Sequence, residues 1–182
     1  MYEDLLEKKL RSENIYDGVL LHVRRDTVTL PNGREAVREW VRHPGASAVL
    51  PVFEDGTVLL VRQYRYPVDR VTLEIPAGKL DSPKEDPLAC AVRELSEETG
   101  YTAKHWEKLT TIGTTVGFSN EYIHIYAAHD LQAGEQHTDD DEFIHVVKMP
   151  LEEAVERVKS GEIFDAKSVT AILMTALGKA KY

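Results

Sequence analysis

The sequence predicts an α+β or layered α/β fold, in which helices pack on a mixed β-sheet. Stretches typical of strands come first, followed by one helical stretch, further strands and two helices near the C-terminal end. Residues 46–53 are almost entirely apolar, as in a strand that is buried on both faces. Residues 88–100 carry one apolar face, as expected for a helix that packs on a core.

Length and composition limit the kinds of protein that this chain can be. Its 182 residues suit one domain, or one domain with an appendage. The single cysteine, Cys90, excludes an internal disulfide framework and a cysteine-based zinc site, which fits a reducing, cytoplasmic setting. No apolar run suits a signal peptide or a membrane span of ~20 residues. The net charge of −9 argues against a nucleic-acid partner but leaves small phosphorylated substrates open.

The first part of the chain reads as a β-rich extension over residues 1–43. A short helix is expected over residues 2–10, because its leucines fall on one side. The turn signal Asn32-Gly33 joins two of the strands that follow. The expected strands cover residues 18–24, 26–30 and 35–43.

The main domain is expected over residues 44–182. No linker rich in glycine, serine or proline separates it from the extension. Its expected strands cover residues 46–53, 57–64, 71–75, 104–112, 122–129 and 143–149. Two helices are expected near its end, one directly after Pro150 and one over residues 165–177.

Capping residues define the central helix at both ends. Asp86 is a suitable N-cap with Pro87 in the first helical position, and Gly100 is a suitable C-cap. A capping box that begins at Ser82 is a competing start. It is less favoured because it places Pro87 inside the helix.

A second face of this helix is acidic. With about 3.6 residues per turn, Glu94, Glu97 and Glu98 fall in one arc of roughly 100°. Carboxylates at this spacing repel one another, and Arg93 is placed to relieve only Glu97 at i, i+4. A cationic partner is therefore expected, and a divalent metal ion is the simplest one. The alternative is a solvated acidic helix.

Residues 78–101 resemble the Nudix box, G-x5-E-x7-R-E-U-x-E-E-x-G-U, in which U is a bulky apolar residue. One position departs from it, since six residues instead of five precede Glu85 and Lys84 takes the strict glutamate position. This is interpreted as a one-residue insertion near Ser82, which leaves the role of Glu85 open. The matching residues are Gly78, Glu85, Arg93, Glu94, Leu95, Glu97, Glu98, Gly100 and Tyr101.

The resemblance implies an α/β/α sandwich-like fold and hydrolysis that depends on two or more Mg²⁺ ions, with Mn²⁺ as a substitute. Mg²⁺ prefers oxygen ligands and is often shared with substrate phosphates. Glu94 and Glu98, one turn apart, are expected to bind the metal ions, and the carbonyl of Ala77 to complete the shell. Glu97 is expected to join them or to hold a metal-bound water, and Arg93 to orient the glutamates.

A wider resemblance points to the ADP-ribose pyrophosphatase branch of this family. The segments that carry it are residues 63–67 (QYRYP), 74–79 (EIPAGK) and 117–121 (GFSNE). It implies hydrolysis of ADP-ribose to AMP and ribose 5-phosphate, by a homodimer whose N-terminal strands are exchanged. Val116 departs from the branch, which often has proline there.

Substrate contacts are expected mainly from this wider resemblance. Arg65 is expected to bind phosphate or ribose, and Glu121 to contact substrate; the alternatives are a surface arginine and a turn carboxylate. Arg42 is either a substrate contact across the dimer or a surface charge. Trp40 is a packing or interface residue, or else stacks on the base.

The acidic run at residues 139–142 is either a solvated loop or the source of the general base. A base must lie within hydrogen-bond reach of the attacking water, and a loop can bring it there. Glu142, beside the next strand, is the first choice, and Asp140 and Asp141 are the others.

Three functions remain open from the sequence. The first is ADP-ribose hydrolysis, and the second is hydrolysis of another nucleoside diphosphate sugar or of a dinucleotide. The third is a sensor that binds ADP-ribose without cleaving it. The full set of glutamates in residues 94–98 argues against the sensor.

Overall fold

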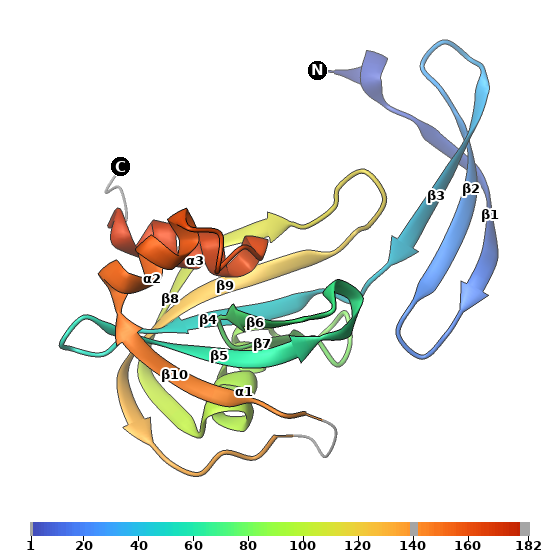
Figure 1. The fold of residues 1–182 in the computed structure, drawn as a ribbon. Coiled ribbons are helices and arrows are strands. Elements are labelled where there is room, and N and C mark those ends of the chain that lie inside the picture. The colour runs from blue at the N-terminus through green and yellow to red at the C-terminus, as the bar shows by residue number, and fades with distance from the viewer. Residues whose placement is uncertain (1, 139–141, 179–182) are drawn as a thin grey trace. The chain divides into compact units, whose positions relative to one another are not determined.

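The computed structural model describes residues 2–138 and 142–178. Asp140 and Asp141, two of the expected site residues, lie outside this part of the chain. The chain divides into two compact units, drawn in Figure 1. The N-terminal unit runs up to Pro44 and includes Gly113–Glu121, and the main unit comprises Gly45–Ile112 and the chain from Tyr122 onward.

The N-terminal unit is a three-stranded antiparallel sheet in the order β1-β2-β3. Its strands are β1 (Lys8–Asp17), β2 (His22–Thr29) and β3 (Glu35–Arg42). The expected Asn32-Gly33 turn joins β2 to β3, and Gly33 has the positive φ of 82° that such a turn requires. The segment Gly113–Glu121 attaches to the end of β3, where Val41 N donates to Phe118 O over 2.8 Å.

Two predictions for this unit are wrong. Residues 2–10 form no α-helix: Glu3–Leu5 is a single 3-10 turn, and β1 begins at Lys8. Every residue of β1 is exposed, so its leucine pattern has no core to face within this chain, and pairing with β2 decides its conformation. The two strands expected at 18–24 and 26–30 are one strand, β2, because Asp26 pairs within the sheet and accepts a hydrogen bond from Trp40 Nε1 at 3.0 Å.

The main unit contains two sheets. The four-stranded sheet has the order β7-β4-β9-β8, with β4 parallel to β9 and antiparallel to β7. The three-stranded sheet has the antiparallel order β10-β5-β6. The strands are β4 (Ala46–Pro51), β5 (Thr57–Arg65), β6 (Arg70–Glu74), β7 (Ala77–Lys79), β8 (Tyr101–Gly113), β9 (Tyr122–Ala133) and β10 (His145–Pro150).

Helices cover both sides of these sheets, as Figure 1 shows. The helix α1 (Pro87–Thr99) packs on β4, β7 and β9. On the other side, α2 (Leu151–Lys159) packs on β5 and β10, and α3 (Ala166–Ala176) packs on β4, β9 and α2. Leu50, Leu60, Ile125 and Ile172 lie fully buried in the core between these elements. The predicted fold class, a mixed sheet with flanking helices, is confirmed.

The strand β7 was not predicted. Pro76 and Gly78 are unfavourable in strands, so the sequence pattern does not indicate a strand there. The strand is only three residues long, and it forms because its backbone pairs with Ala46–Ala48 of the buried strand β4. This pairing places Gly78 beneath α1.

No helix among the described residues is long and apolar enough to cross a membrane.

The caps of α1 provide a first prediction. Asp86 Oδ1 accepts a hydrogen bond from Leu88 N at 2.8 Å, whereas Ser82 Oγ accepts one only from Lys84 N, outside the helix, at 3.3 Å. Asp86→Ala should therefore lower the free energy of unfolding by about 1 kcal/mol, measured by urea denaturation. Ser82→Ala is the control and should leave it nearly unchanged; a larger loss from Ser82→Ala contradicts Asp86 as the cap.

Candidate active site

The site is built on α1, whose start and end are set by its sequence. Asp86 caps the first turn, and Gly100 ends the helix with a φ of 73°. Ala91 and Leu95 are fully buried on the side that faces the sheet. The helix face next to this apolar one carries the glutamates, so the packing of α1 fixes where their carboxylates lie.

Two of these glutamates have little exposure to solvent. Glu98 is only 2% exposed, and its Oε2 accepts a hydrogen bond from Ala77 N at 3.0 Å. Burial, and then repulsion by Glu94, raises the pKa of Glu98 to about 8. Burial also raises the pKa of Glu94. The pair is therefore costly to ionise in the absence of a cation.

Gly78 lets the backbone of β7 approach Glu94 closely. A Cβ atom at this position would lie 1.9 Å from Glu94 Oε1, far inside van der Waals contact. Glycine is the one residue type that leaves this space to the carboxylate. The backbone at Gly78 and the carboxylates of Glu94 and Glu98 together form a cradle.

Arg93 links the glutamates at the edge of this cradle. Its Nη1 donates to Glu94 Oε1 at 2.7 Å and to Glu97 Oε2 at 3.0 Å, which includes the pairing expected at i, i+4. Glu97 is the most exposed of the three acidic residues, with 42% of its side chain accessible. Arg93 therefore holds two carboxylates in place, the arrangement expected of an orienting residue.

Glu85 faces Arg93 and the loop before α1. Its Oε2 accepts a hydrogen bond from Asp81 N at 2.6 Å, and its Oε1 lies 3.6 Å from Arg93 Nη2. These contacts place Glu85 beside the orienting arginine. They leave its assignment as a metal ligand a prediction.

The cradle fits a divalent cation that is shared with a ligand. Among the described residues, no group of three or more His, Cys, Asp or Glu side chains is arranged to hold a metal ion alone. Mg²⁺ usually binds through one or two carboxylates and completes its shell with water and substrate phosphates. Glu94 and Glu98 supply hard oxygen donors, and their raised pKa values are the expected result of two neighbouring carboxylates with little exposure to solvent.

An ion network with a buried carboxylate, that of Glu74, lies directly before the bend at Pro76. Arg65 Nε and Nη2 donate to the two carboxylate oxygens of Glu74 at 3.0 and 2.8 Å. Lys167 Nζ donates to Glu74 Oε2 at 2.5 Å and to Asp165 Oδ2 at 2.8 Å. Burial opposes the charged form of Glu74, but the pairs with Arg65 and Lys167 outweigh it and lower its pKa to about 2.

Reasoning from the sequence missed the part that Lys167 plays in this network. A signal existed, because Lys167 lies in the first turn of α3, where the helix dipole disfavours a cation. A lysine at that position needs a specific acidic partner. Glu74 belongs to a recognised segment, but nothing in its spacing indicated that it pairs with Arg65 and Lys167.

Three expected substrate residues lie in the N-terminal unit. Trp40 is half-buried and donates to Asp26, and Arg42 is exposed at the end of β3. Glu121 Oε2 accepts from Thr114 Oγ1 at 2.6 Å, and its Oε1 lies 3.5 Å from His43 Nδ1. Their roles in substrate binding remain predictions.

Glu142 lies close enough to the cradle for its charge to act there. Behind the effect of burial, Glu142 contributes to the raised pKa values of both Glu94 and Glu98. Its side chain is exposed, and Thr138 Oγ1 donates to its backbone carbonyl at 3.3 Å. An exposed carboxylate beside buried ones suits a proton acceptor, and that role stays a prediction.

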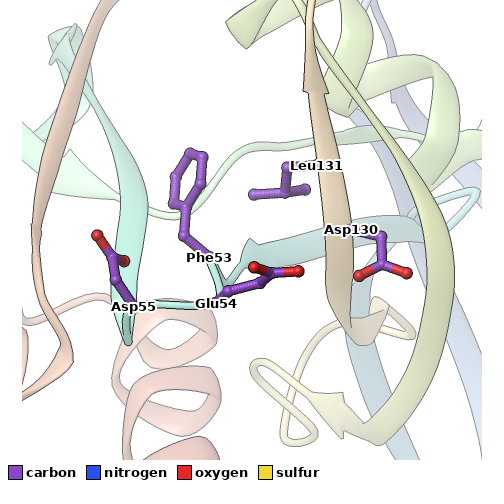
Figure 2. Close-up of a pocket in the computed structure, with 5 residues that line it drawn as sticks. All are labelled: Phe53, Glu54, Asp55, Asp130 and Leu131. Carbon is purple, nitrogen blue, oxygen red and sulfur yellow. The ribbon is translucent and has the colours of Figure 1, made fainter.

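A pocket at the far end of β4 is a poor candidate for an anionic substrate. Figure 2 shows its side chains, which come from the turn between β4 and β5 and from β9. Glu54, Asp55 and Asp130 line it together with Phe53 and Leu131. Three carboxylates repel a diphosphate. None of the expected site residues lines it.

Comparisons with known proteins agree on a family. Residues 41–171 match the family model of the NUDIX domain, and residues 7–41 match that of the nucleoside diphosphate sugar hydrolase N-terminal domain. The chain is 43% identical over 180 residues to an ADP-ribose pyrophosphatase of Bacillus subtilis (strain 168), with 98% of this chain and 97% of that protein covered.

More distant relatives carry related descriptions. A GDP-mannose pyrophosphatase of Cronobacter sakazakii (strain ATCC BAA-894) is 35% identical, with 91% of each chain covered. A solved structure described as that of an ADP compounds hydrolase superposes with a TM-score of 0.82 at 24% identity, covering 97% of this chain and 98% of that one. At this identity, the superposition shows a shared fold.

The lowered pKa of Glu74 predicts how stability depends on pH. Because its pKa is about 2 in the folded chain, against an ordinary value of 4.5, the network stabilises the fold above pH 4.5 and loses this effect as the pH falls toward 2. Glu74→Gln should lower the free energy of unfolding by roughly 3 kcal/mol at pH 7. Urea denaturation at pH 7, 5, 4 and 3 should show the difference from wild type shrinking below pH 4.5.

The exposed Glu35→Gln is the matched control and should show a small difference at every pH. A Glu74→Gln deficit that stays constant from pH 7 to pH 3 contradicts the ion-pair origin of this stability.

Proposed function

Since the chain belongs to the Nudix family of hydrolases, we propose that it cleaves the diphosphate of ADP-ribose to give AMP and ribose 5-phosphate. One observation carries the proposal: the buried carboxylate of Glu98 accepts a hydrogen bond from Ala77 N, and the carboxylate of Glu94, whose side chain is only 12% exposed, lies against the Cβ-free backbone at Gly78. Nudix hydrolases generally use divalent metal ions, and this cradle suits one. The relative from Bacillus subtilis supports ADP-ribose as the substrate.

In the proposed mechanism Glu94 and Glu98 hold Mg²⁺, with Glu97 and the Ala77 carbonyl as further donors, and Mn²⁺ as a substitute. Two or more ions are proposed. When bound, they supply Lewis-acid polarisation of the diphosphate and lower the pKa of the attacking water. Arg93 keeps Glu94 and Glu97 in position through its hydrogen bonds of 2.7 and 3.0 Å.

The remaining steps use side chains around the cradle. Arg65 binds phosphate oxygens with the part of its guanidinium that Glu74 does not occupy. Glu142 accepts a proton from water, whose oxygen bonds to one phosphorus atom, and the bridging oxygen leaves with the other phosphate. Asp140 and Asp141 are the other candidates for this base.

We further propose that residues 1–43 form a dimerisation region and that Trp40, Arg42 and Glu121 contact the adenosine or ribose part of the substrate. Support comes from the match of residues 7–41 to the N-terminal domain of nucleoside diphosphate sugar hydrolases. The strand β1 also exposes Leu10, Ile15 and Tyr16, which a second copy of the chain would cover.

A different nucleoside diphosphate sugar is the second candidate substrate. The relative from Cronobacter sakazakii is described as a GDP-mannose pyrophosphatase, so the same fold serves another base and sugar. A panel of ADP-ribose, ADP-mannose, GDP-mannose, diadenosine polyphosphates and NADH separates the candidates. The highest kcat/KM should belong to ADP-ribose, and a higher value for GDP-mannose contradicts the proposal.

Release of AMP tests the enzyme against the sensor. Wild type with Mg²⁺ should convert ADP-ribose to AMP and ribose 5-phosphate, and chromatography measures the amount of each product. Glu98→Gln should lower kcat by at least about 10²-fold, because it removes a charged donor from the cradle. The exposed Glu152→Gln on α2 should retain wild-type kcat. Tight binding of ADP-ribose without any turnover by wild type points to the sensor.

Gly78→Ala tests the cradle separately from the fold. The added Cβ meets the end of the flexible Glu94 side chain, which can swing away, so the fold should lose little stability. The displaced carboxylate should weaken binding of Mn²⁺ about tenfold or more, measured by electron paramagnetic resonance. Gly117→Ala is the control for the effect of added bulk at a glycine, since its φ is not positive and nothing lies within 4 Å of its Cβ position. Unchanged Mn²⁺ affinity in Gly78→Ala contradicts Glu94 as a ligand.

A further inference from the structure

The first turn of α3 places two polar side chains in the interior. Lys167 is 9% exposed and Ser168 is fully buried. A buried lysine is costly unless it is paired, and Lys167 donates to Glu74 Oε2 at 2.5 Å and to Asp165 Oδ2 at 2.8 Å. Ser168 Oγ accepts a hydrogen bond from Ile75 N at 2.9 Å. Both contacts reach the end of β6, directly before the bend that leads to Gly78.

Glu74 connects Lys167 to Arg65, because its carboxylate accepts hydrogen bonds from both. Its Oε2 accepts from both Lys167 and Arg65, and its Oε1 accepts from Arg65 Nε and from Thr72 Oγ1 at 2.6 Å. The carboxylate is 3% exposed and has four hydrogen bonds, so it has little freedom to move. The bidentate pair fixes the plane of the guanidinium as well as its position.

Arg65 keeps an open edge in this arrangement. Its side chain is 41% exposed, and among the described residues its Nη1 makes no hydrogen bond. Its charge also acts on Glu98, whose pKa it lowers against the larger effects of burial and Glu94. The guanidinium is therefore held by Glu74, is close enough to Glu98 for its charge to act there, and keeps donors for an anion.

Charge adds a second reason for Lys167. Arg65 and Lys167 share the single charge of Glu74, and Asp165 balances Lys167, so the four side chains sum to zero. Without the lysine the group carries a net negative charge beside the position proposed for the diphosphate. Such a charge draws Arg65 more strongly toward Glu74 and so weakens the contact that Arg65 can make with an anionic ligand.

We infer that Lys167 is a positioning residue for substrate binding, which acts through Glu74 to hold Arg65 toward the diphosphate. The inference rests on the proposed function, since it takes Arg65 as the phosphate contact. It makes the start of α3 part of the substrate site, although Lys167 itself touches no substrate. Its effect belongs to binding of the diphosphate, with a smaller effect on the chemical step.

Equilibrium binding tests the inference without turnover. The α,β-methylene analogue of ADP-ribose is titrated into the full chain with Mg²⁺ by calorimetry, and kcat and KM are measured with ADP-ribose. Lys167→Met should raise the Kd and KM about tenfold and change kcat less than threefold. Lys167→Arg, which keeps the charge, should restore both values to within threefold of wild type. Lys167→Gln replaces Lys167→Met if the latter does not fold.

A double-mutant cycle separates this role from general stability. In the background of Arg65→Met, Lys167→Met should add no further loss of affinity, because its effect passes through Arg65. Arg157→Met is the matched control, since it breaks another helix-to-carboxylate network, through Glu162 and on to Arg62 of β5. It should lower the melting temperature without changing the Kd.

Two outcomes overturn the inference: an unchanged Kd in folded Lys167→Met, or the same loss of affinity in the presence and absence of Arg65. Failure of the proposed function gives a different result. If wild type binds the analogue but releases no AMP, the hydrolase is rejected, while the Kd values of the cycle still decide the role of Lys167.

Discussion

The structure depends on holding two carboxylates close together where little water reaches them. Glu98 is almost completely buried, and the side chain of Glu94 beside it is only 12% exposed. This arrangement costs free energy, which the hydrogen bond from Ala77 N and the pair with Arg93 offset in part. The cost remains visible in the raised pKa values of both groups, and the divalent cation proposed here as their ligand would remove it.

The surrounding elements serve this pair. The caps at Asp86 and Gly100 define α1, and burial of Leu95 sets its rotation on the sheet. The edge strand β7 carries a glycine where a side chain would collide with Glu94. A short and locally unfavourable strand is maintained because it pairs with the fully buried strand β4. The packing that forms the core therefore also sets the geometry of the site.

The two arginines near the cradle have different tasks. Arg93 is directed to glutamates of its own helix and links Glu94 and Glu97 through hydrogen bonds from its Nη1. Arg65 is held from behind by Glu74 and keeps exposed donors for an anion. The first arginine organises the proposed metal ligands and the second offers charge to the proposed substrate. This division follows from which neighbours each guanidinium has, and it cannot be read from residue type.

The sequence by itself determined the fold class, the caps of α1 and the acidic face with Glu94, Glu97 and Glu98, because helix periodicity and capping are local properties. Only the tertiary structure decided that residues 8–17 form a strand, that Ala77–Lys79 joins β4, and that Lys167 meets Glu74. Each depends on pairing with another segment, which is the neighbouring strand β2 for residues 8–17 and lies 93 positions away for Lys167 and Glu74. Local pattern carries no record of such partners, since their contact energies exist only once the sheet and α3 have packed.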